Sequence, residues 1–171
     1  MLNKTESYPY NLGEGKLAGA EENDIYYYKG LCYRELGKES EALGCFHKAT
    51  VGSSEPAQAF FYNDQQPDKI FYQGLAWRAL GDEKKARSRF NKLIKHLFDN
   101  CKIDYFAVSL PDLAIWEEDL NKRNLLHCNY VMGLGHLGLG NLVKARSFLE
   151  EVRKLDVNHQ GGQIHLNMCN K

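Results

Sequence analysis

The amino-acid sequence predicts an all-α protein made of stacked helical hairpins, and three observations lead to this prediction. Between Asp24 and Ala49, small and aromatic residues recur at spacings expected for two helices that pack against each other. A glycine, Gly37, stands where the chain must reverse, a position that favours a residue tolerant of positive φ. The same arrangement occurs twice more downstream. Each copy is therefore expected to form one pair of helices, and the pairs are expected to stack.

In each copy, a glycine, an aromatic residue, a second glycine, an alanine and a large apolar residue follow one another in the same register. In the first copy these residues are Gly30, Tyr33, Gly37, Ala42 and Phe46. In the second copy they are Gly74, Trp77, Gly81, Ala86 and Phe90. The third copy is weaker at its aromatic positions, and its residues are Gly133, His136, Gly140, Ala145 and Leu149. We expect the first glycine of each copy to contact the alanine that follows about a dozen positions later, where the two helices meet.

The order and spacing of these residues resemble the tetratricopeptide repeat (TPR), a helix–turn–helix unit of about 34 residues. The resemblance implies a right-handed superhelix of three TPR hairpins, with inserted helices and a C-terminal capping helix. It also implies a binding scaffold rather than an enzyme, whose partner the repeat pattern itself does not identify.

Three further segments, FFYNDQQPD, DYFAVSLPDL and VNHQGGQIHLN, together with the N-terminal YPYNLGEGKL, resemble a more particular group of sequences. They are similar to the C-terminal repeat region of large bacterial proteins that carry a domain of unknown function. In that group an upstream β-rich part is related to carbohydrate-acting proteins. The resemblance implies a tail module of a longer protein or a short relative of it, and it supplies no catalytic residues.

The spacing of the repeats predicts insertions between them. Gly30 and Gly74 are 44 residues apart, and Gly74 and Gly133 are 59 apart, whereas regular repeats recur about every 34 residues. The extra segments either contribute to a binding face or cover apolar ends. We expect a single domain with an extended arm (1–22), repeat 1 (23–51), an insertion (52–66), repeat 2 (67–100), an insertion (101–119), repeat 3 (120–155) and a capping helix (156–171). Short helices are expected near 55–62 and up to and including Trp116, and Asn23 or Asp24 is expected to cap the first helix.

Composition narrows the classes of function. Lysine plus arginine equals aspartate plus glutamate at 22 each, and this balance argues against nucleic acid as the main partner. The chain is 43% hydrophobic, enough for a core, yet no apolar run reaches the ~20 residues that cross a bilayer, and the N-terminus lacks signal-peptide features. An odd number of scattered cysteines favours reduced thiols and a cytoplasmic location; they are Cys32, Cys45, Cys101, Cys128 and Cys169.

The first helix of each pair is expected to line a concave groove. Its residues should be those on the helix face away from Gly30 and Tyr33 and at equivalent positions of the other repeats: Asp24, Tyr27, Leu31, Arg34, Asp68, Phe71, Leu75, Arg78, His127, Tyr130, Leu134 and Leu137. Aromatic and arginine side chains there are typical of interface anchors, and Arg34 and Arg78 could hold a carboxylate or phosphate of a partner. Alternatively, the groove is filled by the protein's own arm or insertions, and both arginines form internal ion pairs. The apolar groove positions argue against capture of a chaperone tail.

Other candidate sites are weaker. The polar cluster from Asn63 to Asp68 either caps helices or presents a hydrogen-bonding edge to a sugar or peptide. Cys45 with His47, His127 with Cys128, and His165 with Cys169 lack a second pair at zinc-site spacing, so no metal site is predicted. Three acids at 117–119 beside Trp116 are explained by a helix start as well as by acid chemistry. No phosphate loop or catalytic motif is present.

The sequence therefore predicts a non-catalytic scaffold without cofactor that binds a protein or peptide partner. The partner is another protein, a second copy of the chain, or the rest of a longer parent chain. The alternative is an accessory module of a carbohydrate-acting bacterial protein, which binds glycan or shapes a neighbouring active site.

Overall fold

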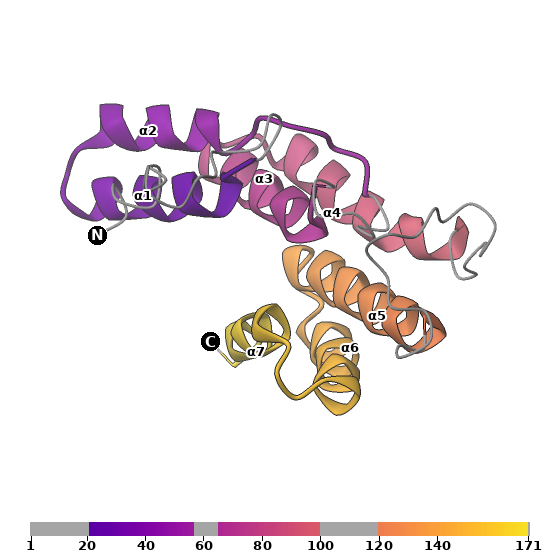
Figure 1. Ribbon diagram of the computed structural model, residues 1–171. Coiled ribbons are helices and arrows are strands. Elements are labelled where there is room, and N and C mark those ends of the chain that lie inside the picture. Colours follow the sequence, from indigo (N-terminus) through magenta and orange to yellow (C-terminus); the bar gives the residue numbers. More distant parts are fainter. Residues whose placement is uncertain (1–20, 57–64, 100–119, 171) are drawn as a thin grey trace, which may run out of the picture.

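The computed structural model describes residues 21–56, 65–99 and 120–170 of the chain. In these residues the chain forms helices only (Figure 1), and their bounds follow the predicted hairpins: α1 (Asn23–Glu35), α2 (Glu39–Lys48), α3 (Pro67–Ala79), α4 (Glu83–Asp99), α5 (Leu120–Gly138), α6 (Leu142–Leu155) and α7 (Gln160–Met168). The predicted arm up to residue 20, most of the helix expected near 55–62, and the helix expected up to and including Trp116 lie outside the described residues. Glu55 and Pro56 are described and are not helical.

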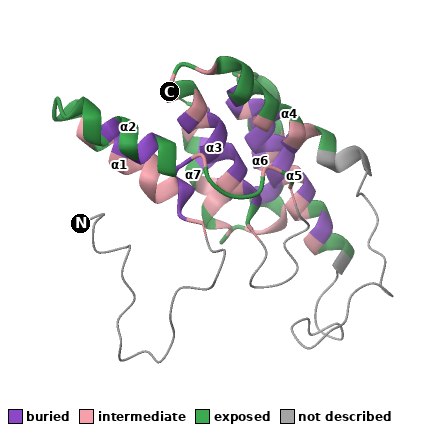
Figure 2. Ribbon diagram, turned by 90° about the horizontal axis from the view of Figure 1, so that it is seen from above, coloured by how far each residue is buried: buried purple, intermediate pink, exposed green. Residues whose placement is uncertain are grey.

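The helices pack as three successive hairpins. α1 packs on α2, α3 on α4, and α5 on α6, while α3 also contacts α1 and α5 and so joins the hairpins into one stack. Buried residues face the interior between these helices, and exposed residues lie on the outer sides of α2 and α4 (Figure 2). The fully buried side chains include Phe90 of α4, Leu134 of α5 and Leu149 of α6. The all-α helical repeat fold predicted from the sequence is thereby confirmed.

The turn inside each hairpin has the backbone that its glycine predicts. Gly37, Gly81 and Gly140 have φ of +71°, +84° and +79°. In the second hairpin the N–H of Gly81 donates to the carbonyl of Arg78 (3.0 Å), and the N–H of Asp82 donates to that of Trp77 (2.9 Å). The other two turns repeat both bonds at equivalent positions. This pairing satisfies carbonyls at the helix end and reverses the chain.

The nearest neighbour of the first glycine of each repeat is the large apolar side chain that follows the predicted alanine. The nearest atoms to a Cβ placed on Gly30 belong to the Phe46 ring, at 2.5 Å, and those to a Cβ on Gly74 belong to the Phe90 ring, at 2.4 Å. At Gly133 the nearest atoms belong to the Leu149 side chain, and the backbone oxygen of Ala145 follows at 3.6 Å. The small residue thus makes room for the large apolar side chain one turn beyond the alanine, because that side chain must fill the space between the two helices.

Asn23 does not cap α1 as predicted. The N-cap position is Glu22, which makes no side-chain capping bond. The buried Asn23 side chain instead donates from Nδ2 to the carbonyls of Ala49 (2.9 Å) and Val51 (2.8 Å). It therefore joins the start of α1 to the end of α2, where helix carbonyls lack intrahelical partners.

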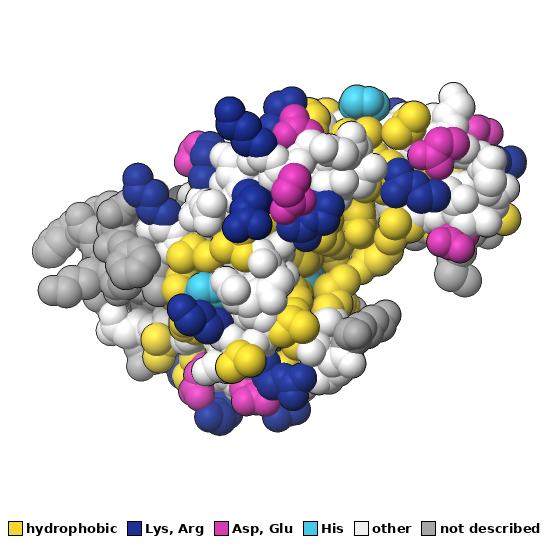
Figure 3. All heavy atoms as spheres, turned by 180° about the vertical axis from the view of Figure 1, so that it is seen from behind, with side chains coloured by type: hydrophobic (Ala, Val, Ile, Leu, Met, Phe, Trp, Pro, Cys, Tyr) yellow, Lys and Arg dark blue, Asp and Glu magenta, His cyan; other side chains and the backbone are white. Residues whose placement is uncertain are grey.

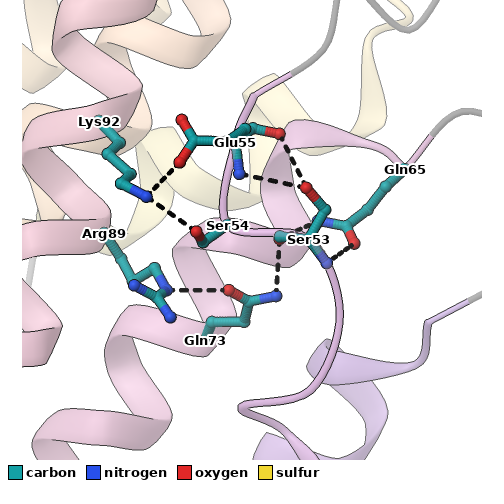
Figure 4. A network of polar contacts seen from close by, with 7 residues as sticks. All are labelled: Ser53, Ser54, Glu55, Gln65, Gln73, Arg89 and Lys92. Atoms are coloured by element: carbon teal, nitrogen blue, oxygen red, sulfur yellow. Dashed lines mark hydrogen bonds and ion pairs between the residues drawn. The ribbon is translucent and has the colours of Figure 1, made fainter.

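A polar network holds the connection between α2 and α3 against the second repeat (Figure 4). The fully buried Gln73 donates from Nε2 to the carbonyls of Val51 (2.9 Å) and Ser53 (3.0 Å), and its Oε1 accepts from Nε of Arg89 at 3.1 Å. Gln65 exchanges two hydrogen bonds with the backbone of Ser53, at 2.7 and 2.9 Å. Part of the predicted polar cluster therefore anchors a loop, since buried backbone carbonyls need donors.

Candidate partner-binding surface

The concave side predicted to be a groove is partly occupied by the chain itself. α7 contacts α6 and α5, and it lies beside α6 and below α3 in the view of Figure 1. Its His165 packs edge-on against the Phe71 ring of α3, with ring centroids 5.2 Å apart, and against Tyr130 of α5 at 5.7 Å. The C-terminal helix, predicted only to cover the last repeat, thus also inserts a side chain between the first helices of repeats 2 and 3.

Three of the predicted groove residues therefore belong to the core. Phe71, Tyr130 and Leu134 are 1%, 7% and 0% exposed and lie in one buried apolar cluster. Leu137 is half-buried against the same cluster. In this structure the protein's own helices cover these three side chains.

A chain of polar contacts links the hairpins through His165. Its Nδ1 lies 2.7 Å from the carbonyl oxygen of Gly161, which only accepts, so Nδ1 carries the proton and donates. Nε2 is then an acceptor, 3.4 Å from the hydroxyl of Tyr72, which in turn lies 3.3 Å from the hydroxyl of Tyr28. The Tyr130 hydroxyl lies 3.2 Å from Nδ1. This relay joins α1, α3, α5 and α7.

Burial determines the protonation of these groups. It lowers the pKa of His165 to about 4, although the hydrogen bond to Gly161 opposes the shift. Burial, followed by the hydrogen bond with Tyr28, raises the pKa of Tyr72. Burial also raises the pKa of Tyr130. All three groups are therefore neutral near pH 7. They pack and form hydrogen bonds in the interior rather than act as acids or bases.

Arg34 and Arg78 join consecutive repeats. Nη2 of Arg34 donates to the carbonyl of Ala79, the last residue of α3, at 3.1 Å; Nη2 of Arg78 donates to the carbonyl of Gly138, the last residue of α5, at 2.9 Å. Each guanidinium also pairs with a glutamate at the start of the next helix, Glu39 at 3.4 Å for Arg34 and Glu83 at 2.8 Å for Arg78. Of the two roles considered for these arginines, the geometry supports the internal one.

Replacing Arg78 by glutamine is expected to lower the free energy of unfolding by about 1–2 kcal/mol. Its side chain is 40% exposed, so the ion pair contributes little, and most of the loss comes from the bond to the Gly138 carbonyl. Thermal unfolding followed by circular dichroism measures the change. Lys38→Gln, which removes one exposed cation, is the control and should leave the melting temperature unchanged. An Arg78 variant as stable as this control would show that the contacts of Arg78 with the next repeat are unimportant for stability.

The remaining predicted groove residues are divided among other contacts. Asp24 forms a salt bridge with Lys69 at 2.5 Å, between α1 and α3. Burial, partly offset by Lys69, raises the pKa of Asp68, whose Oδ1 is buried without a hydrogen bond. His127 is half-buried on α5. These polar residues support the packing of the first helices more than they form one site.

Tyr27, Leu31 and Leu75 keep part of their side chains accessible. All three are half-buried, and the Tyr27 ring lies 5.8 Å from that of Tyr72. Burial raises the pKa of the Tyr27 hydroxyl, although the charges of Arg78 and Arg34 oppose this. Figure 3 shows hydrophobic side chains along a hollow between the α1–α2 hairpin and the α6–α7 part of the molecule. We call Tyr27, Leu31 and Leu75 the open groove.

The described residues contain no group of three or more histidine, cysteine or acidic residues that could hold a metal ion. The four cysteines within them, Cys32, Cys45, Cys128 and Cys169, form no disulfide with one another. None of the helices in this part of the chain is long and apolar enough to span a membrane.

Comparison with known families identifies the repeat unit. Residues 24–50 and 70–96 each match the family model of the tetratricopeptide repeat. These segments cover most of α1 with all of α2, and most of α3 with most of α4. The third hairpin repeats their turn geometry but lies outside the matched residues. No solved structure gives a significant match to the chain.

Proposed function

We propose that this chain is a non-catalytic scaffold that binds a protein segment in the open groove. Tetratricopeptide repeats generally mediate protein–protein interaction, and two segments match that family. The observation that supports the open groove as the site is that Tyr27, Leu31 and Leu75 are only half-buried, whereas the equivalent residues Phe71, Tyr130 and Leu134 are buried. The segment comes from another protein, a second copy, or another part of a longer parent chain.

The contacts of α7 support a helical ligand. α7 presents His165 to Phe71 and Tyr130, the repeat 2 and repeat 3 equivalents of Tyr27. A partner helix that places an apolar or aromatic side chain beside Tyr27 would use the same packing one repeat upstream. Burying a large apolar side chain contributes about 1.5–3 kcal/mol, so a ligand helix needs several such anchors to offset the entropy cost of association. The carbohydrate-linked alternative has no comparable contact among the described residues to support it.

Leu31→Asp is expected to weaken binding of groove-directed peptides at least about tenfold, because a carboxylate would have to be desolvated against the ligand. Peptides selected from a displayed random library against the full chain supply the ligands, and fluorescence anisotropy measures their affinity. Leu43→Asp is the matched control, since Leu43 lies 39% exposed on α2 and should leave affinity unchanged. Selected peptides that bind the Leu31 variant as tightly as the original chain would place the binding surface elsewhere.

A further inference from the structure

One face of α4 carries a concentrated positive charge. Lys84, Arg87, Lys92 and Lys95 lie along it with Ser88 and Asn91 between them. These six residues line a hollow of about 460 Å³, and all except the half-buried Lys92 are exposed. We call this face the α4 strip. Its cations contrast with the zero net charge of the whole chain.

The two acidic residues that precede the α4 strip in the sequence, Asp82 and Glu83, form ion pairs within the chain. Glu83 forms its shorter ion pair with Arg78 of α3 at 2.8 Å and lies 4.0 Å from Arg87, and Asp82 pairs with Lys85 at 2.9 Å. Lys84 and Lys95 form no salt bridge within residues 21–56, 65–99 and 120–170. Within the described residues, no carboxylate therefore competes for two of the four cations.

The chain itself shows how a carboxylate binds at this surface. Nζ of Lys92 pairs with the Glu55 carboxylate and donates to Oγ of Ser54 at 2.8 Å (Figure 4). The hydrogen bond and charge of Lys92 lower the pKa of Glu55, with smaller contributions from the Ser54 hydroxyl and the charge of Arg89. An acidic side chain from a connecting loop thus already uses one end of the strip.

We infer that the α4 strip is a second interaction surface, which binds an acidic segment of a protein partner. The cations span eleven positions, about 16 Å along the helix, and they recur at helical spacing, which matches carboxylates on one face of a partner helix. None of the six lining residues is aromatic, so the strip lacks the stacking groups of surfaces that bind single-stranded nucleic acid. It also lacks the apolar side chains that would enter a lipid surface. The α4 strip is separate from the open groove, so either proposal can fail without the other.

The test measures anisotropy of a fluorescein-labelled helical peptide with glutamate at every third or fourth position, added to the full chain at low ionic strength. We expect saturable binding that weakens as salt is added, because exposed charges are screened. Lys84→Gln combined with Lys95→Gln should weaken it about tenfold. The matched control, Lys144→Gln with Arg153→Gln, removes the same charge from exposed positions of α6 and should have no such effect. A peptide with glutamine in place of glutamate should not bind.

Three results would overturn the inference. The first is no binding of the glutamate peptide, and the second is an equal loss of binding in both double variants. The third is tighter binding of a single-stranded DNA of matched charge that depends on Lys84 and Lys95, which would make the strip a nucleic-acid surface. Circular dichroism of each variant establishes that it is folded, as expected for exposed substitutions.

Discussion

Replacing Gly138 by alanine is expected to lower the free energy of unfolding by about 2 kcal/mol, although the new residue is the better helix former. A Cβ at Gly138 would lie 2.1 Å from the Phe90 ring, and a Cβ at Gly74 would lie 2.4 Å from the same ring. Phe90 is fully buried, and the guanidinium of Arg78 lies 5.0 Å from its centroid. The ring is enclosed by α3, α5 and the arginine, so it cannot move aside. Overpacking of this kind costs about 1–3 kcal/mol.

Gly44→Ala is the matched control for this experiment. Gly44 also lies within a helix, but a Cβ there would have nothing within 4 Å, so the helix-propensity gain of about 0.5–1 kcal/mol should appear unopposed. Urea denaturation measures both variants. We expect the free energy of unfolding to fall in the Gly138 variant and to rise in the Gly44 variant, although the chemical change is the same. A Gly138 variant as stable as the original chain would mean that the Phe90 ring adapts at little cost.

The hairpins could be predicted from sequence because their signals are local. A glycine such as Gly81 between two amphipathic stretches predicts a turn within a few residues of chain, and its positive φ confirms the prediction. The contact made by Gly74 was predicted less well, since spacing shows that two helices meet but not which side chain enters the gap. Phe90 enters it, since its ring atoms are the nearest to a Cβ built on Gly74.

Filling of the groove by the chain itself was one of the alternatives, but that α7 fills it could not be predicted, because this depends on how a distant helix returns to the stack. His165 and Tyr72 are 93 residues apart, and no periodicity in the chain relates them. Sequence reasoning indicated His165 only as a metal-ligand candidate and did not single out Tyr28 or Tyr72. Their occurrence at equivalent positions of two repeats, each next to a predicted groove aromatic, was a signal that could have indicated a shared contact.

The two arginines that join consecutive repeats show why residue type alone did not decide between a binding role and a structural role. Arg34 and Arg78 occupy equivalent positions, and such a pattern fits both a ligand-binding pair and a repeated structural contact. Only the position of the next repeat decides between these two roles. The carbonyl that accepts from each arginine belongs to the last residue of the first helix of the next repeat. In repeat 3 the equivalent residue is Leu137. No further hairpin follows it among the described residues, so there is no next repeat for an arginine to contact there.

Lowering the pH from about 6.5 to about 4 is expected to remove about 3 kcal/mol of stability through His165. In the folded chain burial lowers its pKa to about 4, whereas the ordinary value is 6.5. Between these values the unfolded chain binds a proton that the folded chain does not, so the free energy of unfolding falls as the pH falls. Above pH 6.5 both states are neutral at this residue, and its contribution no longer changes. The magnitude follows from about 1.4 kcal/mol for each pKa unit.

His165→Gln isolates this contribution because glutamine is polar but does not titrate. The variant is expected to be less stable at pH 7, since the ring contacts with Phe71 and Tyr130 are lost, but its stability should fall less steeply below pH 6.5. His136, whose pKa is also lowered by burial, is present in both proteins and cancels in the comparison. Urea denaturation at successive pH values measures both slopes.

Parallel curves would contradict a buried, neutral His165, because a histidine exposed to solvent would titrate alike in the folded and unfolded chains. A difference confined to the interval between pH 4 and 6.5 would instead establish that an uncharged imidazole helps to hold α7 in the stack, and that its protonation opposes the packing of this side chain between Phe71 and Tyr130.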